Sequence, residues 1–300
     1  MKKVLAALLL LTIGACSNGT AARTNASTSK VHVVAAENFW GSLAAQLGGD
    51  RVDVASIIVN PDTDPHDYEP TPADGRKVAS ASFVIENGVG YDAWMDKLLS
   101  ADPVKGRATL DVGKLVGKKE GDNPHRWYFP ADVENVIKRI TADLKRVDRK
   151  DASYFAQRYT DLEQNGLATY HRLLADIKTK YAGTPVGASE SIFVGIAEAT
   201  GLDLITPARY MTAISEGTDP TAQDKATVDR QIAQRELKVF VFNAQNSTPD
   251  VQALVDAAKR ANIPTTTVTE TLSPATASFE EWQSDELTVL RDALAKATGR

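Results

Sequence analysis

Short apolar segments and longer amphipathic ones alternate along most of the chain. In the first half, four short runs are mostly apolar and rich in β-branched residues, at 31–36, 52–59, 82–87 and 108–113. Segments 38–47 and 93–99 lie between them and predict helices. Strands that are apolar along their whole length are buried on both faces, so this half predicts a parallel sheet covered by helices.

The same alternation returns in the second half of the chain. Four further strands are expected, at 184–190, 202–206, 237–243 and 263–270. Helices are expected between and after them, at 192–200, 221–235, 248–261 and 279–298. The pattern therefore predicts a second α/β unit, although no clear sequence repeat relates it to the first.

A different pattern separates the two units. Between Asp151 and Tyr181, apolar or small residues recur at spacings of three or four, at Phe155, Tyr159, Leu162, Gly166, Tyr170, Leu173, Ile177 and Tyr181. This spacing predicts one amphipathic helix of roughly 40 Å, at 1.5 Å per residue. The predicted fold is α/β. Two lobes, residues 31–150 and 183–300, have central parallel-type sheets flanked by helices and are joined by a long helix over 151–182.

The N-terminus predicts a secreted lipoprotein. A basic start precedes an apolar stretch, 4–14, that is too short to span a bilayer, and small residues precede Cys16. We expect residues 1–16 to be a lipoprotein signal peptide and Cys16 to be the lipidation site. The alternative is an ordinary signal peptide with an unrelated cysteine. Residues 17–30 are small and polar, which predicts a flexible tether with a reach of about 20 Å.

Composition narrows the function classes. Cys16 is the only cysteine, so the mature chain has neither a disulfide framework nor a thiolate site. The formal net charge is −5 and no basic stripe appears, so nucleic acid is not an expected partner. We expect an extracytoplasmic protein, anchored to the cell membrane by its lipid and monomeric.

Candidate chemistry lies just beyond the predicted strands. Ligands of open α/β sheets bind at the carboxyl ends of the strands. His66 lies there, in the proline-rich segment DTDPHDYEPTPAD, and His125 lies in DNPHRWYFP. Glu190 and Glu270 follow two strands of the second unit. Two imidazoles and two carboxylates facing a cleft between the lobes suit Mn²⁺, Fe²⁺ or Zn²⁺.

Several segments resemble one family. The motif DPHDYEPTPAD followed by ASFVIENGVGYDAWMDKLL, together with NPHRWYFP, SESIFVGIAEATGL and SEGTDPTAQD, is similar to the metal-binding lipoproteins of manganese/zinc/iron ABC transporters, of the cluster A-I type. The likeness covers nearly the whole mature chain. It implies two α/β lobes joined by a long rigid helix, and a cargo ion in the cleft between them.

The resemblance also implies the ligands. The family's positions fall on His66, His125 and Glu190, with Glu270 where the family usually has an aspartate. The identity of the fourth ligand stays open between Glu270 and another group such as Asn243. Two further departures from the family pattern alter the surroundings of His125: Asn123 and Phe129 stand where aspartates are common.

The expected function is a high-affinity extracytoplasmic receptor, not an enzyme. It would deliver a divalent transition metal to an ABC permease and its ATPase. Residues 100–122 lack the His-rich loop of zinc-type members, which together with Glu190 favours Mn²⁺ or Fe²⁺ over Zn²⁺. The alternatives are a lipid-anchored metallohydrolase, and an organic-solute-binding protein or adhesin.

Other candidates have structural interpretations. We expect His32 to pack within a strand and His171 to be solvated on the long helix or to lie between the lobes. Core packing is expected for three tryptophans, Trp40, Trp94 and Trp127. Surface or capping roles are expected for three glutamates, Glu69, Glu86 and Glu216.

Overall fold

The computed structural model describes residues 30–61, 63 and 68–300. The predicted lipidation site Cys16, the signal peptide, residues 17–29 of the tether and the predicted ligand His66 therefore lie outside the described residues. Within the described ranges, no helix is long and apolar enough to cross a membrane.

The first half of the chain forms a parallel sheet of four strands in the order β2-β1-β3-β4. The strands are β1 Val31–Glu37, β2 Val52–Ile58, β3 Phe83–Glu86 and β4 Ala108–Asp111. The predicted helices are α1 Asn38–Gly48 and α3 Ala93–Ala101. The predictions for this lobe are confirmed to within a few residues, because the strands are apolar along most of their length.

The second half forms another parallel sheet, in the order β6-β5-β7-β8. Its strands are β5 Pro185–Ala188, β6 Asp203–Leu204, β7 Val239–Asn243 and β8 Thr265–Val268. The predicted helices are α8 Val194–Thr200, preceded by the 3₁₀ turn η5 Ser191–Phe193, then α10 Ala222–Ala233, α11 Pro249–Arg260 and α12 Phe279–Thr298. In chain order the two sheets share one topology, so the lobes repeat a fold without an evident sequence repeat.

Four helices lie outside the predicted ranges: α2 Pro72–Ser80, α4 Val112–Leu115, α5 Pro130–Val147 and α9 Ala208–Ser215. Helix α2 is mostly polar and buries only Asp74 and Val78, so its apolar pattern is weak. A capping box fixes its start, because the side chain of Thr71 accepts the backbone N–H of Asp74 and the side chain of Asp74 accepts that of Thr71.

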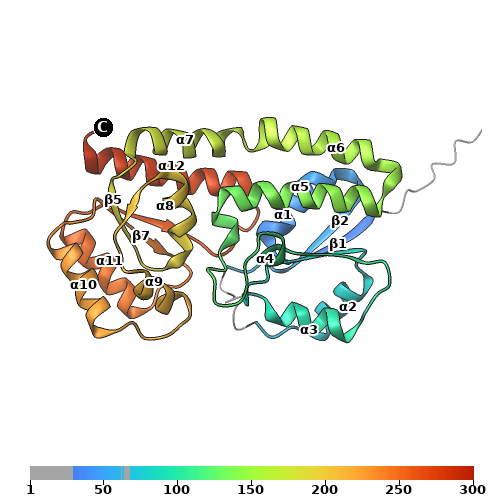
Figure 1. Cartoon of the computed structure of the whole chain (residues 1–300), viewed down its shortest axis with the longest axis horizontal. Coiled ribbons are helices and arrows are strands. Elements are labelled where there is room, and N and C mark those ends of the chain that lie inside the picture. The colour runs from blue at the N-terminus through green and yellow to red at the C-terminus, as the bar shows by residue number, and fades with distance from the viewer. Residues whose placement is uncertain (1–29, 62, 64–67) are drawn as a thin grey trace, which may run out of the picture.

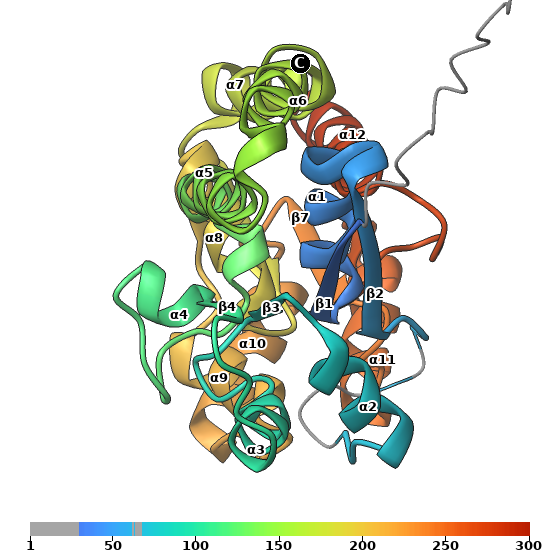
Figure 2. The same ribbon diagram turned by 90° about the vertical axis from the view of Figure 1, so that its right-hand side faces the viewer.

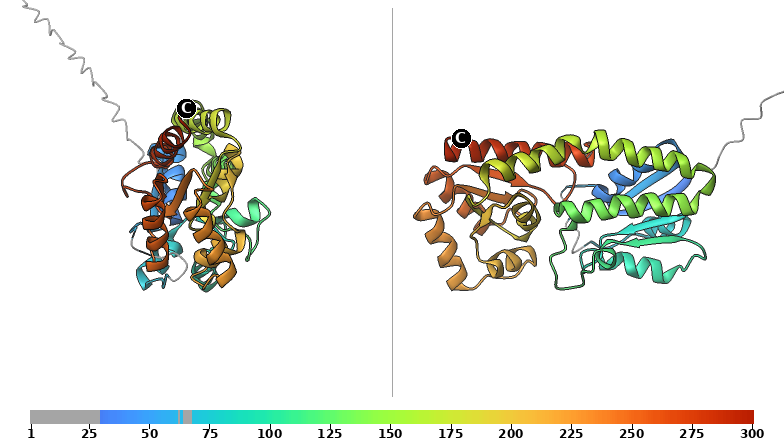
Figure 3. Two further views of the ribbon diagram at one scale, coloured as in Figure 1. Left: turned by 90° about the vertical axis from the view of Figure 1, so that its left-hand side faces the viewer. Right: turned by 45° about the horizontal axis from the view of Figure 1, so that its top comes forward.

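The helical region between the sheets is longer than predicted. Its elements are η2 Arg126–Tyr128, α5 Pro130–Val147, η3 Arg149–Asp151, α6 Ala152–Asp161, a π-helical turn η4 Leu162–Gly166, and α7 Ala168–Tyr181. Residues 152–181 are helical almost throughout, but the π turn interrupts the regular repeat. Gly166 closes this turn, where a Cβ would lie 2.8 Å from Leu162 Cδ1. Helices α6 and α7 run along the length of the molecule and past both sheets (Figures 1 and 3).

The two lobes are packed against each other as well as linked. One continuous cluster of buried apolar side chains includes Val33 of β1 and Val186 of β5. Helix α12 lies beside α7 and reaches the first lobe at its N-terminal end, beside α1 (Figures 1 and 2). There the backbone N–H of Phe279 donates to Ser42 Oγ at 2.9 Å. The second lobe is therefore held to the first at both the linking helices and α12.

Candidate metal centre

His125 lies in the turn before η2 and is fully buried. Its Nδ1 lies 2.9 Å from Asn123 Oδ1, which also accepts the His125 backbone N–H at 3.0 Å. Because an amide oxygen only accepts, Nδ1 carries the proton and Nε2 keeps a free lone pair. Nε2 has no hydrogen-bond partner and lies 3.4 Å from Glu270 Oε1.

Asn123 orients the imidazole although the family pattern commonly has an aspartate there. Its amide Nδ2 donates to the carbonyl oxygen of Ser191 at 2.8 Å. That bond fixes which end of the amide faces His125, and it ties the histidine turn to η5 of the second lobe. A neutral acceptor on Nδ1 fixes the tautomer as an aspartate would, but it adds no negative charge to the site.

Glu190 follows β5 and is buried, with 1% of its surface exposed. Its Oε2 accepts from Asn246 Nδ2 at 3.1 Å and lies 3.4 Å from Ser215 Oγ, while Oε1 has no hydrogen-bond partner. Burial, with a contribution from the charge of Glu270, raises the pKa of Glu190 from 4.5 to about 7, against the lowering effect of His125.

Glu270 follows β8 and is the candidate ligand that lies against His125. Its Oε1 accepts from Asn243 Nδ2 at 2.8 Å and its Oε2 accepts from the Tyr91 hydroxyl at 2.9 Å. Its backbone N–H donates to Gln245 Oε1 at 2.6 Å. Asn243 Oδ1 in turn accepts the backbone N–H of Gln245 at 2.9 Å, so both ends of the Asn243 amide are engaged.

The structure thus brings two of the four predicted ligands into contact, with His125 Nε2 3.4 Å from Glu270 Oε1, and it places Glu190 where the charges of both affect its pKa. His125 comes from the first half of the chain, and Glu190 and Glu270 come from the ends of two strands of the second sheet. The described residues contain no group of three or more His, Cys, Asp or Glu side chains that could hold a metal ion. The fourth predicted ligand, His66, lies outside those residues.

Two buried atoms without hydrogen-bond partners among the described residues indicate what the site could bind. Buried polar atoms nearly always have a hydrogen-bond partner, and leaving one without costs about 1–3 kcal/mol. Here an imidazole nitrogen of His125 and a carboxylate oxygen of Glu190 are both buried without one. A lone pair on nitrogen beside two carboxylates is a donor set for a divalent transition metal.

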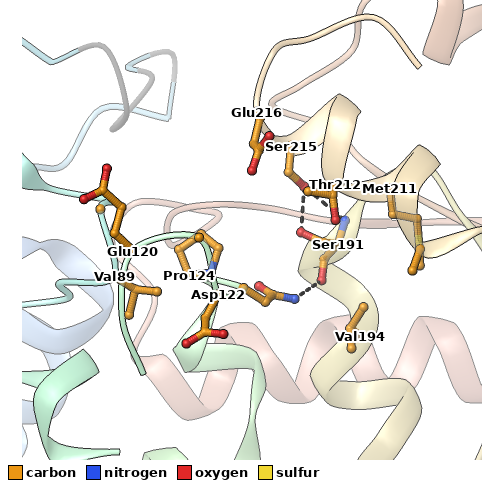
Figure 4. A pocket seen from close by; sticks show the side chains of 14 residues that line it. Val89, Glu120, Asp122, Pro124, Ser191, Val194, Met211, Thr212, Ser215 and Glu216 are labelled. Atoms are coloured by element: carbon orange, nitrogen blue, oxygen red, sulfur yellow. Dashed lines mark hydrogen bonds between the residues drawn. The ribbon is translucent and has the colours of Figure 1, made fainter. Parts of the chain in front are cut away.

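A cavity of about 410 Å³ opens beside these residues. One wall carries Val89, Glu120, Asp122 and Pro124, and the other carries Ser191, Val194, Met211, Thr212, Ser215 and Glu216 (Figure 4). Ser191 and Ser215 are hydrogen-bonded at 2.8 Å, and Ser215 also reaches Glu190. The cavity therefore lies between the lobes and adjoins the candidate ligands, with acidic side chains on both walls.

Sequence reasoning missed the residues that hold the ligands in place. Tyr91 follows β3, and Asn246 and Gln245 follow β7, so the rule that sites form at strand ends could have suggested them. Asn243 was considered only as an alternative ligand. Ser215 lies at the end of a helix that was not predicted; it begins the segment SEGTDPTAQD that carries part of the family resemblance, but no role was predicted for it.

The predictions for the remaining histidines and tryptophans have mixed outcomes. The predicted packing of His32 is wrong, because its side chain is 58% exposed and its Nδ1 lies 3.5 Å from Asp53 Oδ2. His171 is partly exposed on α7, as expected, and pairs with Glu134 at 2.9 Å. The expectation of core packing for the tryptophans is confirmed, because all three are buried, at Trp40, Trp94 and Trp127.

The surface role predicted for Glu86 is also wrong. Glu69 and Glu216 are exposed, but Glu86 is buried at the end of β3. Burial is the main cause that raises its pKa to about 8, and the charge of Asp92 adds to it. Asp92 itself accepts backbone N–H groups of Asn87 and of the residue after it, and burial raises its pKa to about 7.

Comparison with known proteins places the chain in a family. Residues 33–293 match the family model described as zinc-uptake complex component A, periplasmic. The chain is 26% identical over 290 residues to the manganese ABC transporter substrate-binding lipoprotein PsaA of Streptococcus pneumoniae, a match that covers 88% of each protein. It is 27% identical over 291 residues to the metal ABC transporter substrate-binding lipoprotein SsaB of Streptococcus sanguinis, again covering 88% of each.

Solved structures agree on the fold. The Mn-bound periplasmic metal binding protein from Candidatus Liberibacter asiaticus superposes with a TM-score of 0.72 at 18% identity, covering 88% of this chain and 100% of that one. Zn(II)-bound AdcA from Streptococcus pneumoniae gives a TM-score of 0.68 at 18% identity, covering 89% of this chain and 58% of that one. With a family match over most of its length, the chain belongs to the family of zinc-uptake complex component A, periplasmic.

Proposed function

We propose that this protein is an extracytoplasmic receptor that captures one divalent transition metal ion and delivers it to an ABC permease and its ATPase. The ion is the cargo of the protein, and the chain does no chemistry on it. The proposed ligands are His66, His125, Glu190 and Glu270. The relatives named above are substrate-binding proteins of metal ABC transporters, which supports a transport role rather than an enzymatic one.

One observation carries the proposal. His125 Nε2 and Glu190 Oε1 are buried without hydrogen-bond partners, and Glu270 Oε1 lies 3.4 Å from the same nitrogen. Two ligand atoms about 2.0–2.2 Å from a shared ion lie roughly that far apart when they subtend an angle near 100–110°. The spacing of the nitrogen and the oxygen therefore suits a shared cation.

Glu270 is favoured over Asn243 as the fourth ligand. Both ends of the Asn243 amide are engaged, one with Glu270 and one with the backbone of Gln245. The carboxylate brings a negative charge that a divalent cation needs in a buried site, whereas the amide does not. We assign Asn243 the role of holding Glu270 Oε1.

We propose Mn²⁺ or Fe²⁺ as the physiological cargo, with Zn²⁺ as the third candidate. Two carboxylates and two imidazoles form a mixed oxygen and nitrogen set that accepts all three ions, and carboxylate-rich sites suit Mn²⁺. Affinity rises from Mn²⁺ toward Zn²⁺ for a given site, so the ion bound most tightly in vitro need not be the transported one.

We propose that Cys16 carries the lipid that anchors the protein to the cell membrane. The two relatives described above are named lipoproteins, which supports this assignment. Residues 17–30 would then let the two lobes move about 20 Å from the membrane surface, within reach of a permease.

Calorimetric titration of the metal-stripped protein with Mn²⁺, Fe²⁺ and Zn²⁺ tests the function. We expect one ion per chain, and loss of binding in His125→Ala and in Glu190→Ala. His32→Ala is the matched control, because His32 is exposed and distant in sequence from every proposed ligand. Failure of all three ions to bind would refute the receptor function, and metal-dependent turnover of ester substrates would favour the metallohydrolase.

A further inference from the structure

A buried hydrogen-bond network joins the segments that carry His125 and Glu270. The Tyr128 hydroxyl accepts the backbone N–H of Thr269 at 3.2 Å. The hydroxyl proton is within reach of two acceptors, Glu286 Oε2 at 2.7 Å and the Thr269 carbonyl oxygen at 2.9 Å. Tyr128 lies three residues after His125 and Thr269 lies one residue before Glu270, so one side chain connects the two.

Helix α12 supplies the other members of the network. Trp282 Nε1 donates to Thr269 Oγ1 at 2.8 Å and to Glu286 Oε1 at 3.0 Å. The Thr269 hydroxyl also lies 3.1 Å from Glu286 Oε1 and 2.9 Å from the Thr271 carbonyl oxygen. Glu286 therefore gathers donors from three side chains, and the segment that precedes Glu270 is bonded on its backbone and on its side chain.

Three members of the network lie in the interior, and Glu286 is partly buried. Tyr128 and Trp282 are each 1% exposed and Thr269 is 8% exposed. The two rings also contact each other, edge to face, with centroids 5.7 Å apart. In such a dry environment a lost partner is not replaced by water, so each bond restricts the segments it joins.

A second contact fixes the same turn against the second lobe. Gly195 of α8 lies so close to the backbone of η2 that a Cβ at this position would collide with the Tyr128 carbonyl oxygen. The Asn123–Ser191 bond, 2.8 Å long, adds a third attachment two residues before His125. The turn that carries His125 is therefore docked on the lobe that carries Glu190 and Glu270.

We propose that Glu286, acting through the Tyr128 hydroxyl and Thr269, is a positioning residue that holds Glu270 against His125 before the metal arrives. The inference rests on the proposed function, because it assumes that both residues are ligands. Glu286 touches neither ligand atom; it fixes the segments from which the two ligands project. Removing a residue that orients a metal ligand typically lowers metal affinity by about 10–100-fold.

Tyr128→Phe tests the proposal, and Tyr170→Phe is its matched control. Both tyrosines are fully buried, but the Tyr170 hydroxyl has no hydrogen-bond partner in the described part of the chain. Release of Zn²⁺ from the purified protein into excess chelator gives the dissociation rate of the folded molecules. We expect this rate to rise about tenfold in Tyr128→Phe and to stay at the wild-type value in Tyr170→Phe.

A double-mutant cycle separates positioning from a general loss of stability. In a Glu270→Asp background, which keeps a carboxylate ligand on a shorter side chain, the Tyr128→Phe change should accelerate release less than it does with Glu270, because the two changes disturb the same ligand. If Tyr128 only stabilised the fold, its substitution would lower the melting temperature without changing the rate of Zn²⁺ release from the folded protein. Glu286→Gln, which keeps the shape of the side chain, should accelerate release as Tyr128→Phe does.

The outcomes are distinct. Unchanged Zn²⁺ release in both Tyr128→Phe and Glu286→Gln, or equal acceleration by Tyr128→Phe in the Glu270 and Glu270→Asp backgrounds, would overturn the positioning role while leaving the receptor function intact. A wild-type protein that binds none of the three ions would refute the proposed function itself.

Discussion

The pKa of Glu190 predicts how the stability of the metal-free protein depends on pH. Glu190 is buried with one oxygen unpartnered, and its pKa rises from 4.5 to about 7 because burial disfavours the charged form. At 1.36 kcal/mol per pKa unit, ionising this group in the metal-free protein costs on the order of 3 kcal/mol of stability. Glu190→Gln removes the charge and keeps the shape.

The sign follows from proton linkage. Between pH 4.5 and about 7 the folded state binds more protons at Glu190 than the unfolded state does, so stability falls as the pH rises. We therefore expect the free energy of unfolding of the wild type, minus that of Glu190→Gln, to decrease by on the order of 3 kcal/mol between pH 4.5 and pH 8. Taking the difference cancels the constant effect of the new amide and the titration of groups that do not interact with Glu190.

Urea unfolding of both proteins in excess chelator, at several pH values, measures this difference. Glu216→Gln, at the exposed rim of the neighbouring cavity, is the matched control. In the presence of metal, the wild type should be stabilised relative to Glu190→Gln. The ion binds the ionised carboxylate and stabilises only the protein that retains it. A difference that stays constant with pH would refute the assignment of a buried, protonated carboxyl to the metal-free site.

Three further changes test separate parts of the account. Asn243→Ala removes the donor to Glu270 Oε1 and should weaken metal binding about tenfold in calorimetric titration. Gly195→Ala places a methyl group on the Tyr128 carbonyl oxygen and should lower stability by about 1–3 kcal/mol in thermal unfolding. Glu86→Gln should gain stability relative to the wild type as the pH is raised from 5 to 9, because the raised pKa of Glu86, about 8, makes its ionisation unfavourable.

The fold could be predicted to the extent that burial leaves a periodic pattern. Seven of the eight strands are close to the predicted ranges because most of them are rich in apolar or β-branched residues, whereas β6 has only two residues at the edge of its sheet. Helix α2 has too few buried residues to leave a pattern, and its start depends on a capping box rather than on apolar spacing. The π turn at 162–166 shifts the helical repeat by one residue, so the buried residue after Leu162 is Leu167 rather than the predicted Gly166.

The candidate ligands could be predicted from the sequence, whereas most of the residues that hydrogen-bond to them could not. Strand-end logic and the family resemblance selected His125, Glu190 and Glu270; the structure places His125 in contact with Glu270, and Glu190 within electrostatic reach of both. Tyr91 and Asn246 also follow strands, but which side chain beyond a strand end bonds a ligand depends on the loops that fold over the site. Burial of charged residues is equally hard to foresee: the sequence of β3 does not reveal that Glu86 is inside, nor the sequence of β1 that His32 is outside.

An anomalous-difference map of crystals grown with Mn²⁺ tests the central claim most directly. The account predicts one peak per chain, about 2.0–2.3 Å from His125 Nε2 and from carboxylate oxygens of Glu190 and Glu270, with the imidazole of His66 as the fourth ligand. A peak that lies away from His125 and Glu190, or a fully ordered cleft with no peak, would contradict it.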